Sequence, residues 1–275
     1  MGLLSGKYTI VTGGGTGLGF GVAQRFLEEG AASVTIVGRR EDVLQAAAEK
    51  LLALGHTGEV RFKTCDVTHE EQVEAAVEAA CNDNGQLDVM VSNAGTGLPN
   101  AVIDADVAAW SSLLDLNIIG NLLSIKHAAI KMKAAGGSII SISSIEGAAP
   151  SKFMGPYSVS KAGAEMLVKN AALELGPFGV RVNCVRPGMV PTEIVAASLP
   201  QSLQDTYIEE SDLKRAGTPQ EIADAVLYFA SDMGKWTTGQ IMGVCGGAGN
   251  QKGADFSESI GMFYGDDKLK EYTNK

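Results

Sequence analysis

Tyr157 and Lys161 have the side-chain types and the spacing that acid–base chemistry requires. Residues four positions apart on a helix lie on one face, so we expect the two side chains to be neighbours. A free tyrosine has a pKa of about 10, which is too high for an effective acid or base near neutral pH. An adjacent ammonium stabilises a phenolate and lowers that pKa. The pair therefore predicts a tyrosine that exchanges a proton, although a tyrosine at a helix start and a surface lysine would give the same pattern.

Ser144 is a second candidate for the same site. It ends an expected strand, in Ser141-Ile142-Ser143-Ser144, thirteen residues before Tyr157. Its hydroxyl should then lie at the carboxyl edge of the sheet, where open α/β folds bind their ligands. Serine is also an ordinary residue at the end of a strand, so it gains weight only together with the tyrosine and the lysine.

The segment Thr12–Gly19 has the composition of a phosphate-binding loop. Its glycines permit a tight turn and let backbone N–H groups approach a pyrophosphate at the positive end of a helix. The spacing is T-G-x-x-x-G-x-G, which does not fit the common fingerprint G-x-G-x-x-G in any register. Because the loop lies between the first expected strand and the first expected helix, it predicts nucleotide binding. The alternative is a simple tight connection.

Arg39 and Arg40 follow the second expected strand, where an acidic residue usually bonds the 2′-hydroxyl of NAD. Arginine instead suits a 2′-phosphate. No Asp or Glu occurs here before Glu41. The sequence therefore favours NADP over NAD, unless both arginines only pair with Glu41 or Asp42 at the surface.

These residues must be positioned by an alternation of short apolar runs and longer helical patterns. The runs are mostly continuous and β-branched, as in parallel strands covered on both faces. We expect strands at Tyr8–Thr12, Ser33–Val37, Val60–Cys65, Leu87–Val91, Ser138–Ser143, Arg181–Val185 and Ile241–Val244. We expect helices at Gly17–Glu29, Glu41–Leu54, Glu70–Asn82, Trp110–Lys133, Tyr157–Leu175 and Pro219–Ala230.

This alternation predicts an α/β fold of the Rossmann-like, doubly wound kind, with a parallel sheet of seven strands flanked by helices on both faces. No linker or repeat divides residues 1–248, so we expect a single domain for dinucleotide binding and catalysis. Pro191–Asp212 is longer than an ordinary connection and is expected to line the substrate cleft. Residues 249–275 form a C-terminal extension.

Composition excludes several classes of protein. The 275 residues include 22 basic and 32 acidic side chains, a formal charge of −10, which argues against nucleic-acid and anionic-membrane partners. No apolar run approaches the roughly 20 residues of a membrane span, and no signal peptide is evident. Four scattered cysteines and three histidines give no disulfide framework and no metal site. We expect an acidic cytoplasmic protein.

Taken together, the motifs resemble the short-chain dehydrogenase/reductase family in its standard subtype. The match runs from about Leu4 to Gly247. The motifs occur in the family's order: Thr12–Gly19, Asp66-Val67, Asn93-Ala94-Gly95, Asn117, Ser144, Tyr157-Ser158-Val159-Ser160-Lys161 and Pro187-Gly188-Met189-Val190-Pro191-Thr192.

The resemblance implies roles for four catalytic residues. Tyr157 would be the general acid in reduction and the general base in oxidation, and Ser144 would hold the carbonyl oxygen. Lys161 would bind the nicotinamide ribose and favour the phenolate, while Asn117 would help to hold a water that relays protons. The cofactor-binding residues would be Gly13, Gly15, Thr16, Gly17, Leu18, Gly19, Arg39, Arg40, Asp66, Val67, Asn93, Ala94, Gly95, Tyr157, Lys161, Pro187, Gly188, Val190 and Thr192.

Two departures from the family pattern bear on the cofactor. Ser92 stands where the family usually has the first asparagine of Asn-Asn-Ala-Gly. Thr16 stands where NADP-dependent members often carry a basic residue, so the NADP prediction depends on Arg39 and Arg40. Members also commonly end near Gly247, which makes the tail an addition.

Other activities share the expected fold. Related enoyl reductases space the tyrosine and lysine seven apart, and dienoyl-CoA reductases have a similar Gly-Gly-Gly-Thr-Gly loop without Tyr-x-x-x-Lys. A 3-oxoacyl carrier-protein reductase would need a basic docking surface, which a charge of −10 disfavours. A non-catalytic NADP-binding protein would usually lack the tyrosine or the lysine.

The expected substrate is a small hydrophobic ketone or its alcohol. Loops at the carboxyl edge contribute mostly apolar side chains, with adaptable methionines. The substrate candidates are Ser144, Glu146, Met154, Tyr157, Met189 and Val195, with Leu98, Pro99, Ile145, Ile194, Leu199 and Tyr207 nearby. Glu146 could bond a substrate hydroxyl or be a solvated loop carboxylate.

Two further expectations concern assembly. The helices Trp110–Lys133 and Tyr157–Leu175 are apolar on more than one face, so they need more cover than the sheet provides. The family resemblance implies that these helices pack against a second subunit, in a tetramer or a dimer. In the tail, Asp255–Tyr264 concentrates apolar residues and is expected to dock near the substrate cleft or a subunit interface.

Overall fold

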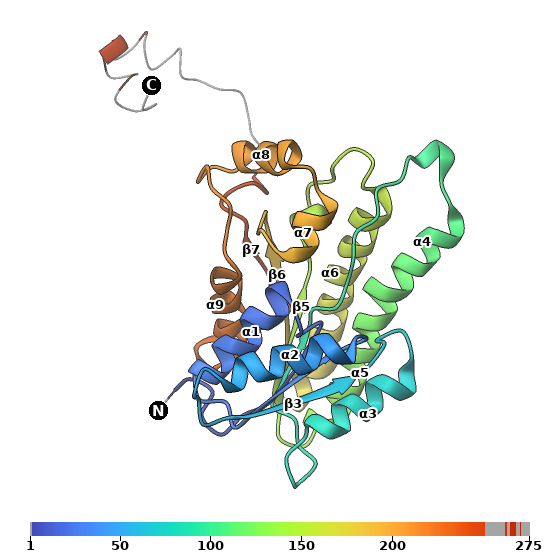
Figure 1. Ribbon diagram of the computed structural model, residues 1–275, viewed down its shortest axis with the longest axis vertical. Helices are drawn as coiled ribbons and strands as arrows, with labels where there is room; N and C mark the ends of the chain where they lie inside the picture. Colours follow the sequence, from blue (N-terminus) through green and yellow to red (C-terminus); the bar gives the residue numbers. More distant parts are fainter. Residues whose placement is uncertain (1, 251–261, 263–264, 268–269, 271–275) are drawn as a thin grey trace.

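The seven strands form one sheet in which every neighbouring pair is parallel. The computed structural model describes residues 2–250, 262, 265–267 and 270 (Figure 1). The strand order is β3-β2-β1-β4-β5-β6-β7. The strands are β1 (Tyr8–Thr12), β2 (Ser33–Gly38), β3 (Glu59–Thr64), β4 (Val89–Ser92), β5 (Gly137–Ile142), β6 (Val180–Pro187) and β7 (Ile241–Val244). The predicted doubly wound parallel sheet is confirmed, and the strand ends differ from those expected by only a few residues.

Helices cover both faces of the sheet, as right-handed crossovers between parallel strands require. Successive strand residues point to opposite faces: Val11 packs with α1, α2 and α9, whereas Ile10 packs with α3, α5 and α6. The helices are α1 (Gly17–Glu28), α2 (Glu41–Leu52), α3 (Glu70–Ala80), α4 (Val107–Leu114), α5 (Gly120–Met132), α6 (Gly155–Leu175), α7 (Glu193–Ser198), α8 (Gln201–Glu210) and α9 (Pro219–Ala230). This double cover explains why the central strands are continuous apolar runs.

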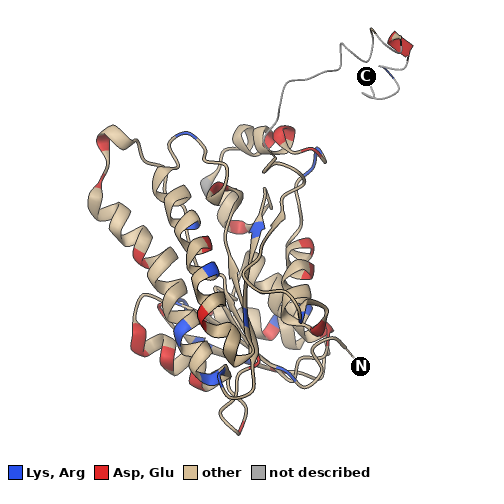
Figure 2. Cartoon of the chain, turned by 180° about the vertical axis from the view of Figure 1, so that it is seen from behind, with Lys and Arg blue, Asp and Glu red and all other residues tan. Residues whose placement is uncertain are grey.

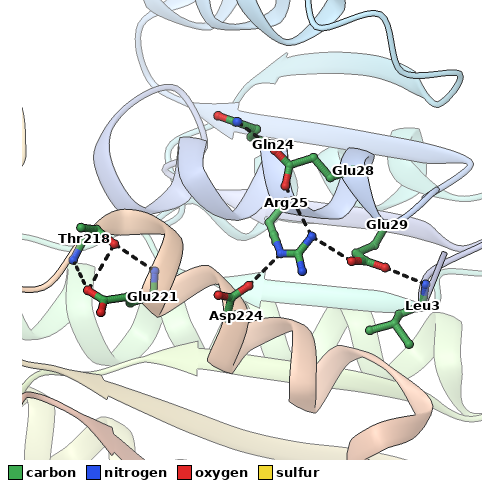
Figure 3. A network of polar contacts seen from close by, with 8 residues as sticks. All are labelled: Leu3, Gln24, Arg25, Glu28, Glu29, Thr218, Glu221 and Asp224. Atoms are coloured by element: carbon green, nitrogen blue, oxygen red, sulfur yellow. Dashed lines mark hydrogen bonds and ion pairs between the residues drawn. The ribbon is translucent and has the colours of Figure 1, made fainter.

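A polar network joins α1 to α9 on the first face (Figure 3). Arg25 Nε donates to Asp224 Oδ1 at 2.7 Å, and Arg25 also pairs with Glu29, whose carboxylate accepts from the Leu3 backbone N–H. Thr218 and Glu221 form a reciprocal capping box at the start of α9. The capping box satisfies N–H groups at the start of α9, whereas the Arg25–Asp224 pair links the two helices at the periphery of the core.

The predicted continuous helix over Trp110–Lys133 is interrupted. A π-helical turn at Asp115–Ile119 separates α4 from α5. Such single turns insert one extra residue per turn and often occur at functional sites. Here the turn contains Asn117, a buried residue of the predicted site. The apolar pattern on either side has helical periodicity and gave no sign of the extra residue.

The stretch Val107–Met132 also corrects the expectation about apolar runs. Its 26 residues include a window of mean hydropathy 1.2, so by length and composition alone it could cross a membrane. In the fold, α5 packs against β4 and β5 and buries Leu123, Ile125 and Met132 in the core. Core helices of α/β proteins often pass this compositional test, so the stretch is weak evidence for a membrane span.

The long segment before the last helix is folded. Pro191–Asp212 contains α7 and α8, which lie above the carboxyl ends of the strands (Figure 1). Thr192 caps α7 by accepting from the Val195 backbone N–H. The expectation that Asp255–Tyr264 docks onto the body falls, apart from Met262, outside the described residues.

Candidate active site

One cavity at the carboxyl edge of the sheet brings the sequence-predicted residues together. Its volume is about 460 Å³, within the usual range for small-molecule sites. Every predicted catalytic, cofactor and substrate residue lines it except Gly19 and Asn117. The glycine loop, Tyr157 and the apolar substrate candidates therefore share a single cleft, as expected for a topological switch point between β1 and β4.

Tyr157 and Lys161 lie in the first turns of α6, where the chain enters the helix through Gly155 and Pro156. Proline suits this position because its missing N–H would be unpaired anyway. Lys161 Nζ lies 5.6 Å from the centre of the Tyr157 ring. It also donates to the Ile142 carbonyl at 3.0 Å, and the side chain is buried. The ammonium is thus held between the end of β5 and the tyrosine.

Asn117 lies behind the cavity and joins three parts of its wall. Its Oδ1 accepts from the Thr96 N–H at 3.1 Å, while Nδ2 donates to the Thr96 carbonyl and to Ser160 Oγ, both at 2.9 Å. Ser160 in turn donates to the Tyr157 carbonyl at 2.7 Å. The π-helical turn therefore aims a buried amide at the loop after β4 and at the turn of α6 that carries the tyrosine. A Cβ on Gly95 would lie 2.9 Å from Asn117 Oδ1, so this contact requires glycine there.

Ser144 and Glu146 follow β5 and form the next part of the wall. Ser144 Oγ accepts from the Glu146 backbone N–H at 3.3 Å, as the cap of a short 3₁₀ turn. The Glu146 side chain is not a solvated loop carboxylate, since the residue is 4% exposed. Its two oxygens are already occupied by donors from this chain.

The glycine loop between β1 and α1 has the backbone geometry of an anion cradle. Gly13 and Gly17 have φ values of 65° and 52°, a region that favours glycine. A Cβ on Gly19 would meet the Gly13 carbonyl oxygen at 2.3 Å, so Gly19 allows the loop to close on the helix instead of lining the cavity. Asn93 Nδ2 donates to the Thr12 carbonyl at 2.9 Å and ties the loop to the end of β4. The positive end of α1 consequently opens onto the cavity.

Arg39, Arg40 and Asp66 lie at the other end of the cleft. Both arginines are exposed, and in the described part of the chain neither makes a hydrogen bond or ion pair with Glu41 or Asp42. Burial alone would raise the pKa of the Asp66 carboxyl, but hydrogen bonds from Thr68, helped by the nearby Arg39 charge, lower it overall. This end therefore has both an ionised carboxylate and uncommitted guanidinium groups.

Sequence reasoning missed some lining residues. Thr96 directly follows Asn93-Ala94-Gly95, and Leu116 precedes Asn117, so proximity to these motifs was the available signal. Leu98 lines an adjoining hollow of about 470 Å³, while Pro99 lines neither. Among the residues the structure describes, no group of three or more His, Cys, Asp or Glu side chains could hold a metal ion.

Comparison with known proteins agrees with this geometry. A family model described as Enoyl-(Acyl carrier protein) reductase matches residues 13–249. A solved short-chain type dehydrogenase/reductase from Mycobacterium ulcerans is 37% identical, with a TM-score of 0.85, over 97% of this chain and 99% of that one. The chain belongs to the short-chain dehydrogenase/reductase family. This confirms the resemblance seen in the sequence and makes the protein an oxidoreductase.

Several members of this short-chain dehydrogenase/reductase family resemble the chain over most of their length. Trans-4-hydroxycyclohexanecarboxylate dehydrogenase of Sinomonas cyclohexanicum is 40% identical, over 89% of this chain and 94% of the relative. A 3-oxoacyl-(acyl-carrier-protein) reductase of Chlamydia muridarum is 37% identical, over 89% and 98%. The solved 7α-hydroxysteroid dehydrogenase complexed with NADH and 7-oxo glycochenodeoxycholic acid is 32% identical, with a TM-score of 0.84, over 89% and 94%. Relatives at similar identity thus differ in substrate, so the substrate must be argued from the cleft itself.

Proposed function

We propose that this enzyme interconverts a hydrophobic ketone and its secondary alcohol, with a nicotinamide cofactor and Tyr157 as general acid and base. The observation that carries this proposal is that Ser144, Tyr157 and Lys161 line the same cavity as the glycine loop, with Asn117 directly behind them. A bound substrate can then reach the acid–base group of Tyr157 and the hydroxyl of Ser144, beside the loop that would hold the dinucleotide.

The proposed roles follow from this placement. When bound, a nicotinamide cofactor supplies the hydride in reduction or accepts it in oxidation. In reduction Tyr157 donates its phenolic proton to the carbonyl oxygen, and in oxidation it takes the proton of the alcohol. Ser144 donates a hydrogen bond to the same oxygen and stabilises the charge that develops there. The Lys161 ammonium stabilises the phenolate left behind, and Asn117 holds the Thr96 loop and the Tyr157 turn in register.

The residues present fit the cofactor. The glycine loop and the start of α1 would hold the pyrophosphate, because Gly13 and Gly17 give the turn its left-handed backbone and the N–H groups at a helix start bind anions. Asp66 and Val67 would lie at the adenine, with Asn93, Ala94 and Gly95 near the ribose. Pro187, Gly188, Val190 and Thr192 would lie at the carboxamide. We propose NADP as the preferred cofactor, since Arg39 and Arg40 line the cleft and form no ion pair with a carboxylate among the residues that the structure describes.

The substrate end of the cleft supports a neutral, hydrophobic ligand. Met154, Met189, Ile194, Val195 and Leu199 line it. Apart from Lys161, the described lining residues include no cation at this end, because Arg39 and Arg40 lie beyond the glycine loop. A carboxylate substrate would therefore lack an ionic partner, whereas an alicyclic ketone would exchange water for apolar contacts.

Carrier-protein chemistry is the second candidate, favoured by the Chlamydia muridarum relative. An acidic carrier needs a basic docking surface, and the basic residues coloured on the cartoon of Figure 2 are interspersed with acidic ones instead of gathered together. We therefore rank a 3-oxoacyl-thioester substrate below a small free ketone. Enoyl or dienoyl-CoA reduction and a non-catalytic role rank lower, because the tyrosine, lysine and serine are all in place.

We also propose a homo-oligomer, a tetramer or a dimer, in the cytoplasm. Leu122, Val159, Met166 and Leu173 leave apolar area exposed on α5 and α6, which a second copy would cover.

The cysteines support the proposed cytoplasmic location. All four are free thiols, and burial raises the pKa of Cys65 to about 11 and that of Cys184 to about 12. Unpaired thiols suit a reducing compartment.

A substrate panel tests the proposed function. Alicyclic ketones, hydroxycyclohexanecarboxylate-type acids and 3-oxoacyl thioesters would be compared at the NADPH absorbance, in parallel with NADH. We expect the highest kcat/KM with a neutral alicyclic ketone and NADPH. Turnover of thioesters alone would favour the second candidate, and no turnover by any member would favour the non-catalytic reading.

A further inference from the structure

We propose that Glu146 is a positioning residue that fastens α8 to the turn after β5, which carries Ser144, and thereby sets the size of the substrate pocket. The proposal rests on the proposed ketoreductase function and deepens it, since it names residues that select the substrate. This role takes the place of the expectation that the Glu146 carboxylate bonds a substrate hydroxyl directly.

The carboxylate of Glu146 has donors on both oxygens. Oε1 accepts from Ser151 Oγ at 2.5 Å and from the Tyr207 hydroxyl at 3.0 Å. Oε2 accepts from the Ser151 backbone N–H at 2.9 Å and from Ser158 Oγ at 2.8 Å. Glu146 makes no ion pair with a lysine or arginine in the described part of the chain, so these donors alone compensate its burial.

The donors come from the loop that enters α6, from α6 itself and from α8. Ser158 directly follows Tyr157 in the first turn of α6, and Ser151 belongs to the loop that enters this helix. Glu146 itself follows Ser144 and donates its backbone N–H to that hydroxyl. Tyr207 comes from α8, in the segment that closes the cleft. One carboxylate therefore connects the wall of the substrate pocket to the two residues that handle the carbonyl oxygen.

This connection matters for α8 because the helix lies at the surface of the described structure. No residue of α8 is buried. Three other side chains of α8 bond only within Pro191–Asp212. Gln201 donates to Asp205, Gln204 to the Leu199 carbonyl and Thr206 to the Ser202 carbonyl. Tyr207 alone among these side chains reaches across the cleft, where its ring lines the cavity. Burial raises the pKa of the Tyr207 hydroxyl, so it remains a protonated donor to Glu146.

The position of α8 determines how closely the apolar wall meets a substrate. Ile194, Val195 and Leu199 belong to the same segment and face the cavity from α7 and the turn after it. With Tyr207 bonded to Glu146, a small ketone touches this wall. Without the bond, the wall can move outward, and small ketones lose contacts that bulky ketones retain. The Glu146–Tyr207 pair therefore favours compact substrates.

Tyr207→Phe tests this inference, because it deletes the hydroxyl and keeps the ring. Tyr228→Phe is the matched control, since the Tyr228 hydroxyl bonds Thr237 Oγ1 at 3.1 Å, outside the residues that line the cavity. We expect Tyr207→Phe to raise KM for a compact ketone roughly tenfold, as loss of one hydrogen bond to a charged group implies, with kcat and NADPH affinity nearly unchanged. KM for a bulky ketone should change much less. An unchanged ratio of the two KM values would overturn the role in selection.

A second measurement does not depend on any substrate. Hydrogen exchange of the amides in α8 should be faster in Tyr207→Phe than in the wild type or Tyr228→Phe, because the helix opens more often. Equal exchange in all three proteins would overturn the fastening itself. If no ketone is turned over, the exchange measurement still decides whether the Tyr207–Glu146 contact holds α8. Failure of the proposed function can therefore be told apart from failure of this inference. Glu146→Gln should also speed exchange and additionally lower kcat, since its amide donor faces the donors of Ser151 and Ser158.

Discussion

Arg186 and Glu165 form a two-pronged ion pair directly behind Lys161. Arg186 Nε lies 2.8 Å from Glu165 Oε1, and Nη2 lies 2.5 Å from Oε2. Glu165 is one turn after Lys161 on α6 and also accepts from Ser143 Oγ at 2.8 Å. Arg186 lies on β6 and immediately precedes Pro187 and Gly188, which line the cleft. The pair thus ties the lysine helix to β6 and to the end of β5, two of the strands whose ends line the cavity.

Removing one member of this pair should cost more stability than removing both. Glu165→Gln leaves the Arg186 charge without its partner, and we expect a loss of about 2–3 kcal/mol, below the fully buried case because the Arg186 side chain is 23% exposed. The double variant Glu165→Gln with Arg186→Met should recover part of this loss. Urea unfolding of the two single variants and the double variant measures the coupling. Additive effects would mean that the pair does not stabilise the fold.

Tyr157→Phe should abolish most of the activity without disturbing the fold. It removes the proposed proton donor and keeps the ring, so turnover should fall about 10²–10⁴-fold. NADPH affinity, measured by fluorescence, should persist because the phenol is not a phosphate ligand. Tyr228→Phe is again the matched control. Wild-type turnover in Tyr157→Phe would refute the assigned role.

Arg39→Asp should reverse the cofactor preference. The change replaces attraction for a 2′-phosphate with repulsion, and a charge-assisted bond is worth about 1.5–3 kcal/mol. NADPH should therefore weaken at least roughly tenfold, while NADH binding holds or improves. Lys133→Asp makes the same charge change at an exposed position at the end of α5 and should leave both affinities unchanged. A preference that stays the same in Arg39→Asp would show that this arginine does not contact the cofactor.

A charge on the exposed face of α6 should disrupt assembly. Met166 is 56% exposed on α6, so Met166→Glu would place a carboxylate in the proposed subunit contact. Light scattering should find an oligomer for the wild type and smaller species for this variant. Leu52→Glu, equally exposed on α2, is the control and should assemble normally. A wild-type protein that scatters only as a 28.6 kDa species at micromolar concentration would reject the oligomer.

The sequence by itself determined the features that depend on neighbouring residues. Tyr157 and Lys161 share a helix face because of their spacing, and the run Thr12–Gly19 can only be a tight turn between a strand and a helix. The alternation of apolar strands with amphipathic helices likewise led directly to a parallel sheet with helices on both faces. These inferences needed only helical and extended geometry, which act over a few residues.

Only the tertiary structure decided which distant side chains meet. Glu146 and Tyr207 are 61 positions apart, Asn117 and Ser160 are 43 apart, and Glu165 and Arg186 lie on different elements. The π-helical turn that aims Asn117 at Thr96 leaves no trace in the apolar pattern, and the polar sequence of α8 gave no indication that Tyr207 would hold it. The sequence does not distinguish a polar side chain that faces water from one that bonds a buried partner. The choice depends on where the folded backbone places that partner, because a buried polar group is tolerated only where its hydrogen bonds are made.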